Sequence, residues 1–232
     1  MSMLIFAHRG ASKAAPENTV KAFKLAFEQR ADGIEFDTYQ HESGIIVFHD
    51  RTLTRRARES GYLLDVPWQS LTEMDIGDGE RIPTLTETLN CVPKDKWCNI
   101  EIKHLRDVDS WIKDVKAAVQ QSGINAEKLL ISSFNHHWLQ AIALKWPEVK
   151  IGALSASYEL DCTASARALN AYSVNIALDA VDKQFVQTAQ QDGFDVFVYT
   201  VDEPRDMLML NEWGVTGIFT NVPDVALGVL SH

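Results

Sequence analysis

The 232-residue sequence has few cysteines and no long hydrophobic run. Its three cysteines, Cys91, Cys98 and Cys162, cannot all pair within one chain, and their spacing matches no zinc motif. We therefore expect free, buried thiols in a reducing cytoplasm. No apolar stretch approaches the roughly 18 residues of a membrane-spanning helix, so no membrane insertion is expected. The first residues lack the basic and hydrophobic regions of a secretion signal, so none is expected.

Basic residues are also scarce. Lys and Arg number 22 against 32 Asp and Glu, which gives a formal net charge of −10. The field of the whole chain repels polyanions, so we expect no nucleic-acid partner. One short basic run, containing Arg51, Arg55, Arg56 and Arg58, is interpreted as a solvated face. The alternative is a patch that steers anions to a site.

Short β-rich runs alternate with amphipathic segments of helical period. Strands that alternate with helices pair in parallel, and eight such units predict an α/β protein with a closed (β/α)₈ TIM barrel, in one domain over residues 1–232. An open doubly wound sheet is the alternative, but no GxGxxG follows the first strand. The predicted strands are Leu4–Ala7, Gly33–Thr38, Cys98–Lys103, Leu129–Ser133, Lys150–Leu154, Ser173–Ile176, Asp195–Thr200 and Gly217–Thr220.

Two segments interrupt this alternation. Ile45–Phe48 follows the second strand too closely for a parallel crossover. The short separation predicts an antiparallel β-hairpin, in which Asp37 lies roughly opposite His49. Residues 51–84 have weak periodicity and predict a small insertion that caps one end of the barrel. Asn18 is the predicted N-cap of the first helix.

Carboxylates occupy one face of two predicted strands. Residues i and i+2 of a strand share a face, so Glu35 lies beside Asp37, and Glu101 lies beside Lys103. Barrel strands are normally apolar on both faces, and an unpaired buried carboxylate costs several kcal/mol. Three converging carboxylates therefore predict a site for a hard divalent cation, Mg²⁺ or Ca²⁺. Solvated charges on half-exposed strands are the alternative.

Two histidines end strands next to these carboxylates. His8 ends the first strand and His49 ends the hairpin strand, which favours general acid/base roles. Arg9 and Lys103 are candidates for contacts with an anionic oxygen, and arginine suits bidentate phosphate binding.

An ordered set of segments resembles the glycerophosphodiester phosphodiesterase family, in its bacterial cytoplasmic type. The resemblance runs nearly from end to end. The matching segments are His8–Ala11, Ala15–Thr19, Gly33–Asp37, Val47–Asp50, Arg51–Arg55, Gly77–Leu85, Glu101–Lys103, Ser132–Phe134, Tyr199–Val201 and Gly217–Asp224.

The resemblance implies a (β/α)₈ barrel that hydrolyses glycerophosphodiesters, such as glycerophosphocholine or glycerophosphoethanolamine, to glycerol 3-phosphate and an alcohol with a divalent cation. By motif, His8 and His49 would be the acid/base pair. Glu35, Asp37 and Glu101 would be the metal ligands. The resemblance leaves open which histidine is the acid, and whether water or the substrate's own glycerol hydroxyl attacks.

The remaining site residues also follow from the resemblance. Arg9, Lys103 and Tyr199 would contact the substrate, while Glu17 and Asn18 would support the site. Two positions depart from the family's pattern, because Tyr199 stands where tryptophan is common and Asn221 where aspartate is common. We expect neither to touch the catalytic groups, so only headgroup selectivity is in doubt.

Two other functions remain as alternatives. A phospholipase C- or D-like enzyme acting on intact lipids would use the same architecture, but it would need a membrane-docking surface, and no basic amphipathic helix supplies one. A non-catalytic phosphodiester-binding module would not need two acid/base groups. The expected partner is thus a small-molecule glycerophosphodiester, and the sequence does not specify the oligomeric state.

Overall fold

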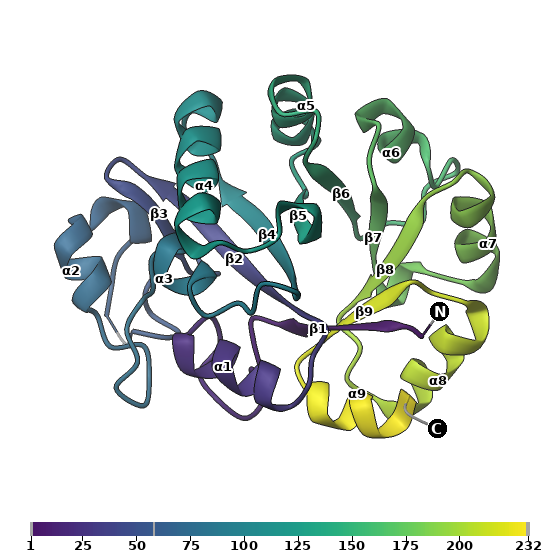
Figure 1. The fold of residues 1–232 in the computed structure, drawn as a ribbon, viewed down its shortest axis with the longest axis horizontal. Coiled ribbons are helices and arrows are strands. Elements are labelled where there is room, and N and C mark those ends of the chain that lie inside the picture. The colour runs from purple at the N-terminus through teal and green to yellow at the C-terminus, as the bar shows by residue number, and fades with distance from the viewer. Residues whose placement is uncertain (1, 58, 231–232) are drawn as a thin grey trace.

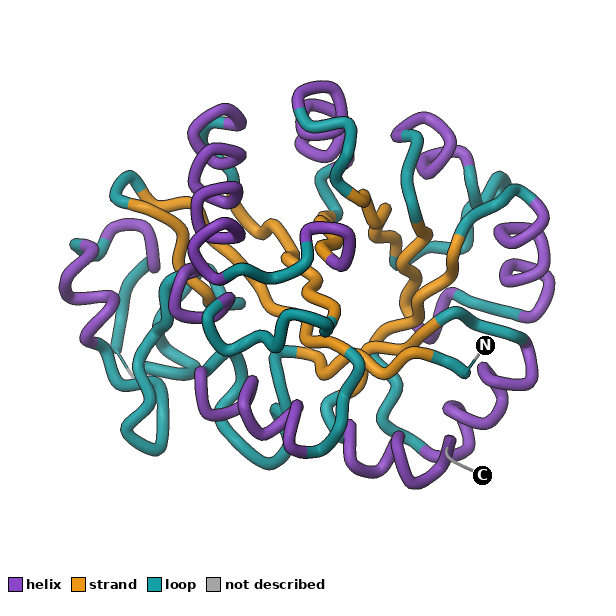
Figure 2. Tube along the Cα trace, viewed as in Figure 1, coloured by secondary structure: helices purple, strands orange, loops and turns teal. Residues whose placement is uncertain are grey.

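The computed structural model describes residues 2–57 and 59–230, and within them eight parallel strands close a barrel. Strand β1 pairs with both β2 and β9, which closes the sheet. Helices surround the strands on the outside (Figures 1 and 2). The predicted (β/α)₈ barrel is confirmed. Its strands are β1 (Leu4–His8), β2 (Gly33–His41), β4 (Trp97–His104), β5 (Leu129–Ser133), β6 (Lys150–Ser155), β7 (Ser173–Ala177), β8 (Asp195–Tyr199) and β9 (Gly217–Thr220).

The predicted strand positions agree with the observed ones to within a few residues. The largest difference is in β2, which continues three residues past Thr38 to His41. The added residues pair with β3 (Gly44–Val47), whose antiparallel register sets Thr38 opposite Val47. The predicted hairpin is therefore confirmed, and the amide of Phe48 donates to the carbonyl of Asp37 at 2.9 Å.

The helices alternate with the strands, and their ends follow local chemistry. The side chain of Asp107 caps α4, and Gly123 ends that helix with a φ of 68°. The α-helices are α1 (Val20–Glu28), α2 (Trp68–Glu73), α3 (Leu85–Leu89), α4 (Val108–Ser122), α5 (His136–Lys145), α6 (Ala164–Leu169), α7 (Lys183–Gln191), α8 (Pro204–Trp213) and α9 (Pro223–Leu230). The short 3₁₀ helices are η1 (Leu63–Asp65), η2 (Ala126–Lys128) and η3 (Leu178–Ala180).

The prediction that Asn18 caps α1 is wrong. Thr19 is the N-cap, and its side chain accepts a hydrogen bond from the amide of Ala22. Asn18 instead has a φ of 58°, in the left-handed region that non-glycine residues rarely adopt. This conformation frees the Asn18 side chain from the helix, and it turns toward the strands.

Residues 51–84 contain η1 and α2 and lie beside β2 and β3, at one side of the barrel (Figure 1). An apolar cluster of its own holds this segment to the hairpin. The cluster consists of Tyr39, Ile46, Phe48, Leu53, Leu63, Leu71, Met74, Ile76 and Ile82.

Apolar side chains fill the barrel and the layer between strands and helices. Inside the barrel, Phe6 packs against Phe197 and Phe219 with ring centroids 5.5 and 5.2 Å apart. All three cysteines are free thiols, but Cys98 alone is buried, since Cys91 and Cys162 are half-buried. Among the helices of the described residues, none has the length and apolar character needed to cross a membrane.

Candidate active site

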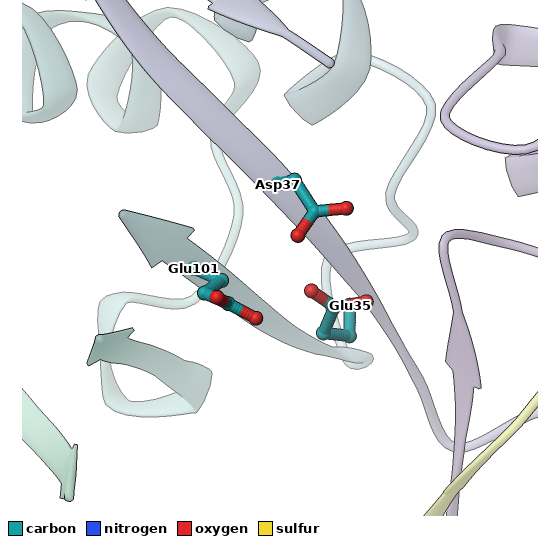
Figure 3. Close-up of side chains that lie close together, drawn as sticks. All are labelled: Glu35, Asp37 and Glu101. Carbon is teal, nitrogen blue, oxygen red and sulfur yellow. The ribbon is translucent and has the colours of Figure 1, made fainter. Parts of the chain in front are cut away.

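Three carboxylates converge from two neighbouring strands. Glu35 and Asp37 lie on one face of β2, and the parallel register sets Asp37 opposite Glu101 of β4. Their side chains gather between the two strands (Figure 3). One oxygen from each lies within 4.8 Å of the other two, and all three residues are buried, with Asp37 at 0% exposure. The alternative of solvated charges is therefore excluded.

Burial and the neighbouring charges shift the pKa values of all three carboxylates. Burial, with the nearby charges of Asp37 and Glu101, raises the pKa of Glu35 well above its ordinary value. Burial and the charge of Asp37 likewise raise the pKa of Glu101 to about 7. For Asp37 itself, burial is outweighed by the neighbouring cations, and its pKa is lowered. One carboxylate with a lowered pKa thus lies beside two carboxylates with raised pKa values.

The cations that hold the Asp37 charge are Arg9 and Lys103. Arg9 Nε lies 3.0 Å from one carboxylate oxygen of Asp37, and Lys103 Nζ lies 3.3 Å from the other. Lys103 also donates to Glu101 at 2.6 Å. The Arg9 backbone has a φ of 57°, and its amide donates to the carbonyl and the side chain of Glu35. The structure thus gathers the predicted cations and carboxylates in one place.

These residues fit a divalent cation. The Oε1 atom of Glu35 is buried without a hydrogen-bond donor, which is costly unless another positive group compensates. The donor set consists of oxygens alone, the chemistry that Mg²⁺ and Ca²⁺ prefer. Within the described residues, Glu35, Asp37 and Glu101 form the one acidic cluster with this spacing.

Metal affinity should depend on pH. We expect Mg²⁺ or Ca²⁺ to bind about tenfold more weakly at pH 6 than at pH 8, because Glu101, with a pKa of about 7, must lose its proton to act as a ligand. Calorimetric titration at both pH values measures the difference. Glu101→Gln lacks the titrating group and should bind weakly at both. Equal affinity of the unaltered protein at pH 6 and pH 8 would contradict the expectation.

His8, at the end of β1, lies in a hydrogen-bonded chain that ends on a carboxylate. Its Nδ1 atom is 2.9 Å from Oδ1 of Asn221, and the Asn221 side-chain amide donates to Asp202 at 2.7 Å. Because Asp202 can only accept, the amide of Asn221 is oriented and its oxygen faces His8. Neutral His8 therefore carries its proton on Nδ1, while Nε2 lies 3.9 Å from Glu35. Burial lowers the pKa of His8 to about 4.

The expectation that Asn221 stays away from the catalytic groups is therefore wrong. Asn221 directly follows β9, which pairs with β1, so the closure of the barrel brings it to His8. Ser12 joins the same group, with its hydroxyl 2.7 Å from Asn221 Oδ1. The missed contact spans 213 positions in the sequence.

His49 has a charged partner instead. Its Nδ1 atom lies 2.6 Å from Oδ1 of Asp50, the next residue along the chain. Tyr39 donates its hydroxyl to the backbone carbonyl of His49 at 3.1 Å, which fixes the residue against β2. Both histidines lie close enough to Asp37 to help lower its pKa when they are charged.

The two supporting residues lie beside the same cluster. Asn18 donates its side-chain amide to Asp37 at 2.9 Å. Glu17 contacts three arginines: Arg9 at 3.2 Å, and also Arg55 and Arg56 of the basic run. The interpretation of that run as a solvated face is thus wrong for Arg55 and Arg56, and Arg58 lies outside the described residues.

Tyr199 lies at the end of β8. Its hydroxyl donates to the carbonyl of Ser155 at 2.7 Å, and its ring meets the half-exposed ring of Phe134 edge to face at 6.0 Å. Lys103 Nζ lies 5.8 Å from the centre of the Phe134 ring. Phe134, Lys103, Glu101 and Arg51 contribute to the lining of an open groove of about 600 Å³.

Comparisons with known proteins identify the family of the chain. The model of the "Glycerophosphoryl diester phosphodiesterase family" matches residues 8–225. A glycerophosphodiester phosphodiesterase from Caldanaerobacter subterraneus subsp. tengcongensis is 34% identical, over 99% of this chain and 98% of the relative. One from Bacillus subtilis is 28% identical, over 96% of this chain and 85% of the relative.

A solved structure shares both the fold and a recognisable part of the sequence. It is an Oleispira antarctica phosphodiesterase in complex with its product sn-glycerol-3-phosphate. The two proteins superpose with a TM-score of 0.91 and are 25% identical, over 100% of this chain and 98% of the other.

Proposed function

Because the chain belongs to the glycerophosphoryl diester phosphodiesterase family and is a phosphoric diester hydrolase, we propose that it hydrolyses glycerophosphodiesters to glycerol 3-phosphate and an alcohol with the help of a divalent cation. One observation carries the proposal: the buried cluster of Glu35, Asp37 and Glu101 contacts Arg9 and Lys103, with His8 3.9 Å from Glu35 and His49 near enough for its charge to act on Asp37. The product bound by the Oleispira antarctica relative supports glycerol 3-phosphate as the product here.

The charged groups have two roles at the phosphate: the carboxylates bind the cation, and the basic side chains supply positive charge. Glu35, Asp37 and Glu101 would hold the cation, Mg²⁺ or Ca²⁺, which when bound neutralises charge on the phosphate oxygens. Arg9 and Lys103 supply further positive charge in a largely buried setting, where such charge stabilises a transition state more strongly than in water. An acidic chain can thus bind one phosphodiester without a broad basic surface.

His8 is the general base in this proposal. Its low pKa, caused first by burial and then by Arg9, keeps the ring neutral at pH 7. The hydrogen bond from Nδ1 to Asn221 leaves the lone pair of Nε2 directed toward the side of Glu35. Nε2 takes the proton of the attacking hydroxyl, whether that hydroxyl belongs to water or to the substrate's glycerol.

His49 is the general acid. Asp50 lies 2.6 Å from its Nδ1 atom, and this contact fixes the orientation of the imidazole ring. As the phosphorus–oxygen bond to the leaving alcohol breaks, His49 gives that oxygen a proton. Because His8 is neutral at pH 7 and is assigned as the base, the role of acid falls to His49.

The substrate would extend from the phosphate into the groove lined by Phe134 and Arg51. Phe134 and Tyr199 offer apolar surface there, next to Lys103. Glycerophosphocholine and glycerophosphoethanolamine are the substrates we propose. We also propose that residues 1–232 form a single domain and that the enzyme acts in the cytoplasm, where its thiols stay reduced.

A substrate comparison tests the proposed function. Purified protein is incubated with glycerophosphocholine or with phosphatidylcholine vesicles, and released glycerol 3-phosphate or headgroup is measured enzymatically. We expect glycerol 3-phosphate from the water-soluble diester and little turnover of vesicles. Turnover confined to vesicles would support a phospholipase instead, and binding without turnover of either substrate would support a binding module.

Asn221 gives a prediction for the base. Asn221→Leu should lower kcat by roughly 10- to 100-fold while KM changes little, because His8 loses the acceptor that fixes its proton on Nδ1. Steady-state kinetics on glycerophosphocholine measure both constants. Asn221→Asp retains an acceptor for Nδ1 and should recover most of the loss. Equal losses in the two variants would show that the contact with His8 is unimportant.

A further inference from the structure

Arg55 bridges two carboxylates, each of which supports a different part of the site. Its Nε atom donates to Oδ2 of Asp50 at 2.5 Å. Its two terminal nitrogens donate to the two oxygens of Glu17, at 2.5 and 3.1 Å. Asp50 in turn contacts His49, and Glu17 contacts Arg9. The Arg55 guanidinium group therefore connects Asp50, which contacts His49, with Glu17, which contacts Arg9.

The geometry points to Arg55 as a positioning residue for the general acid: we propose that it holds the Asp50 carboxylate against His49. This inference rests on the proposed function, because it assumes that His49 protonates the leaving alcohol. Asp50 uses one oxygen for His49 and the other for Arg55. Among the described residues, no other side chain has a hydrogen bond to Asp50. Without Arg55 its carboxylate would be free to turn into solvent.

The backbone that carries Arg55 is well anchored. Leu53 is fully buried in the apolar cluster beside the hairpin, and the amide of Ala57 donates to the carbonyl of Leu53 at 2.9 Å. Arg55 thus projects from a turn held on a packed base, although its own side chain is 46% exposed. Its planar fork suits this role, because an ammonium group cannot serve two carboxylates with the same fixed geometry.

Arg56 provides a matched control. It is the next residue, it carries the same charge, and it contacts Glu17 without touching Asp50. Loss of Arg56 therefore removes one of the arginines around Glu17, and it leaves the contacts of Asp50 and His49 in place. A difference in activity between Arg55→Ala and Arg56→Ala therefore reports the loss of the contact between Arg55 and Asp50.

The test compares two leaving groups. An alkoxide needs a proton as it leaves, whereas 4-nitrophenolate does not, so a weakened acid slows only the first reaction. We measure kcat and KM for glycerophosphocholine and for the 4-nitrophenyl diester of glycerol 3-phosphate. With Arg55→Ala we expect kcat for glycerophosphocholine to fall by about 10- to 100-fold, and kcat for the nitrophenyl ester to fall less than about threefold. Arg56→Ala should change both by less than about threefold.

Three further experiments distinguish a positioning role of Arg55 from a loss of structure. Arg55→Lys should recover part of the loss, and free guanidinium should restore activity to Arg55→Ala but not to His49→Ala. Thermal unfolding shows whether each variant is folded. Equal losses on both substrates, or equal losses in Arg55→Ala and Arg56→Ala, would overturn the inference. An unaltered protein that hydrolyses neither diester would instead overturn the proposed function.

Discussion

Asp37→Asn should lower kcat/KM on glycerophosphocholine by about 1,000-fold or more. The substitution retains the size of the side chain but removes the one carboxylate of the cluster whose pKa is held low by Arg9 and Lys103. It therefore removes the negative charge of Asp37 that would attract the cation, and catalysis through that cation falls with it. Steady-state kinetics and metal titration measure the two losses separately.

The variant should nevertheless fold. The charge of Asp37 is one of the causes that raise the pKa values of Glu35 and Glu101, so both ionise more readily without it and replace it as partners of the cations. A matched control is Asp109→Asn, which removes an exposed carboxylate of α4 that is paired with Lys145 of α5. It should leave kcat/KM unchanged. A folded Asp37→Asn protein that retains both metal affinity and activity would contradict the assignment of the cluster.

Removal of either histidine should lower kcat on glycerophosphocholine by roughly 10²- to 10⁴-fold, the usual contribution of a general acid or base. The two variants should differ in their response to the leaving group. His8→Ala should lose activity on glycerophosphocholine and on the 4-nitrophenyl ester alike, because both reactions need the base. His49→Ala should lose it mainly on glycerophosphocholine. Parallel kinetics on both substrates measure the difference.

Metal binding should be retained in both histidine variants, because neither side chain belongs to the carboxylate cluster. His41→Asn is a suitable control, since His41 lies at the far end of β2 and its ring accepts from the amide of Ser43. It should leave kcat unchanged. If His8→Ala were slowed only with the alkoxide leaving group, the roles of the two histidines would be exchanged.

The sequence predicted the carboxylate cluster well because the information was local. The period of a strand places Glu35 beside Asp37, and the expectation that barrel strands are apolar makes such charges conspicuous. The barrel itself followed from the alternation of strands and helices. The convergence of Glu101 on the other two then followed from the parallel pairing of neighbouring strands.

The missed residues depend on contacts between distant segments. Asn221 reaches His8 only because the last strand pairs with the first, and Asp202 orients it from the loop after β8. Arg55 looked like part of a solvated basic run, because nothing in its neighbourhood shows that Glu17, 38 positions away, lies within reach, although Asp50 is only five positions away. The choice of general base likewise depended on the burial of His8 and on the amide beside it.

In the proposed function, a divalent cation held by Glu35, Asp37 and Glu101 is needed for cleavage of a glycerophosphodiester. The most direct test strips the protein with a chelator, removes the chelator and titrates Mg²⁺ or Ca²⁺ back while glycerol 3-phosphate release from glycerophosphocholine is followed. We expect no turnover without metal, and a recovery of turnover that saturates with the metal bound at the cluster. Full turnover by the metal-free protein would contradict this expectation.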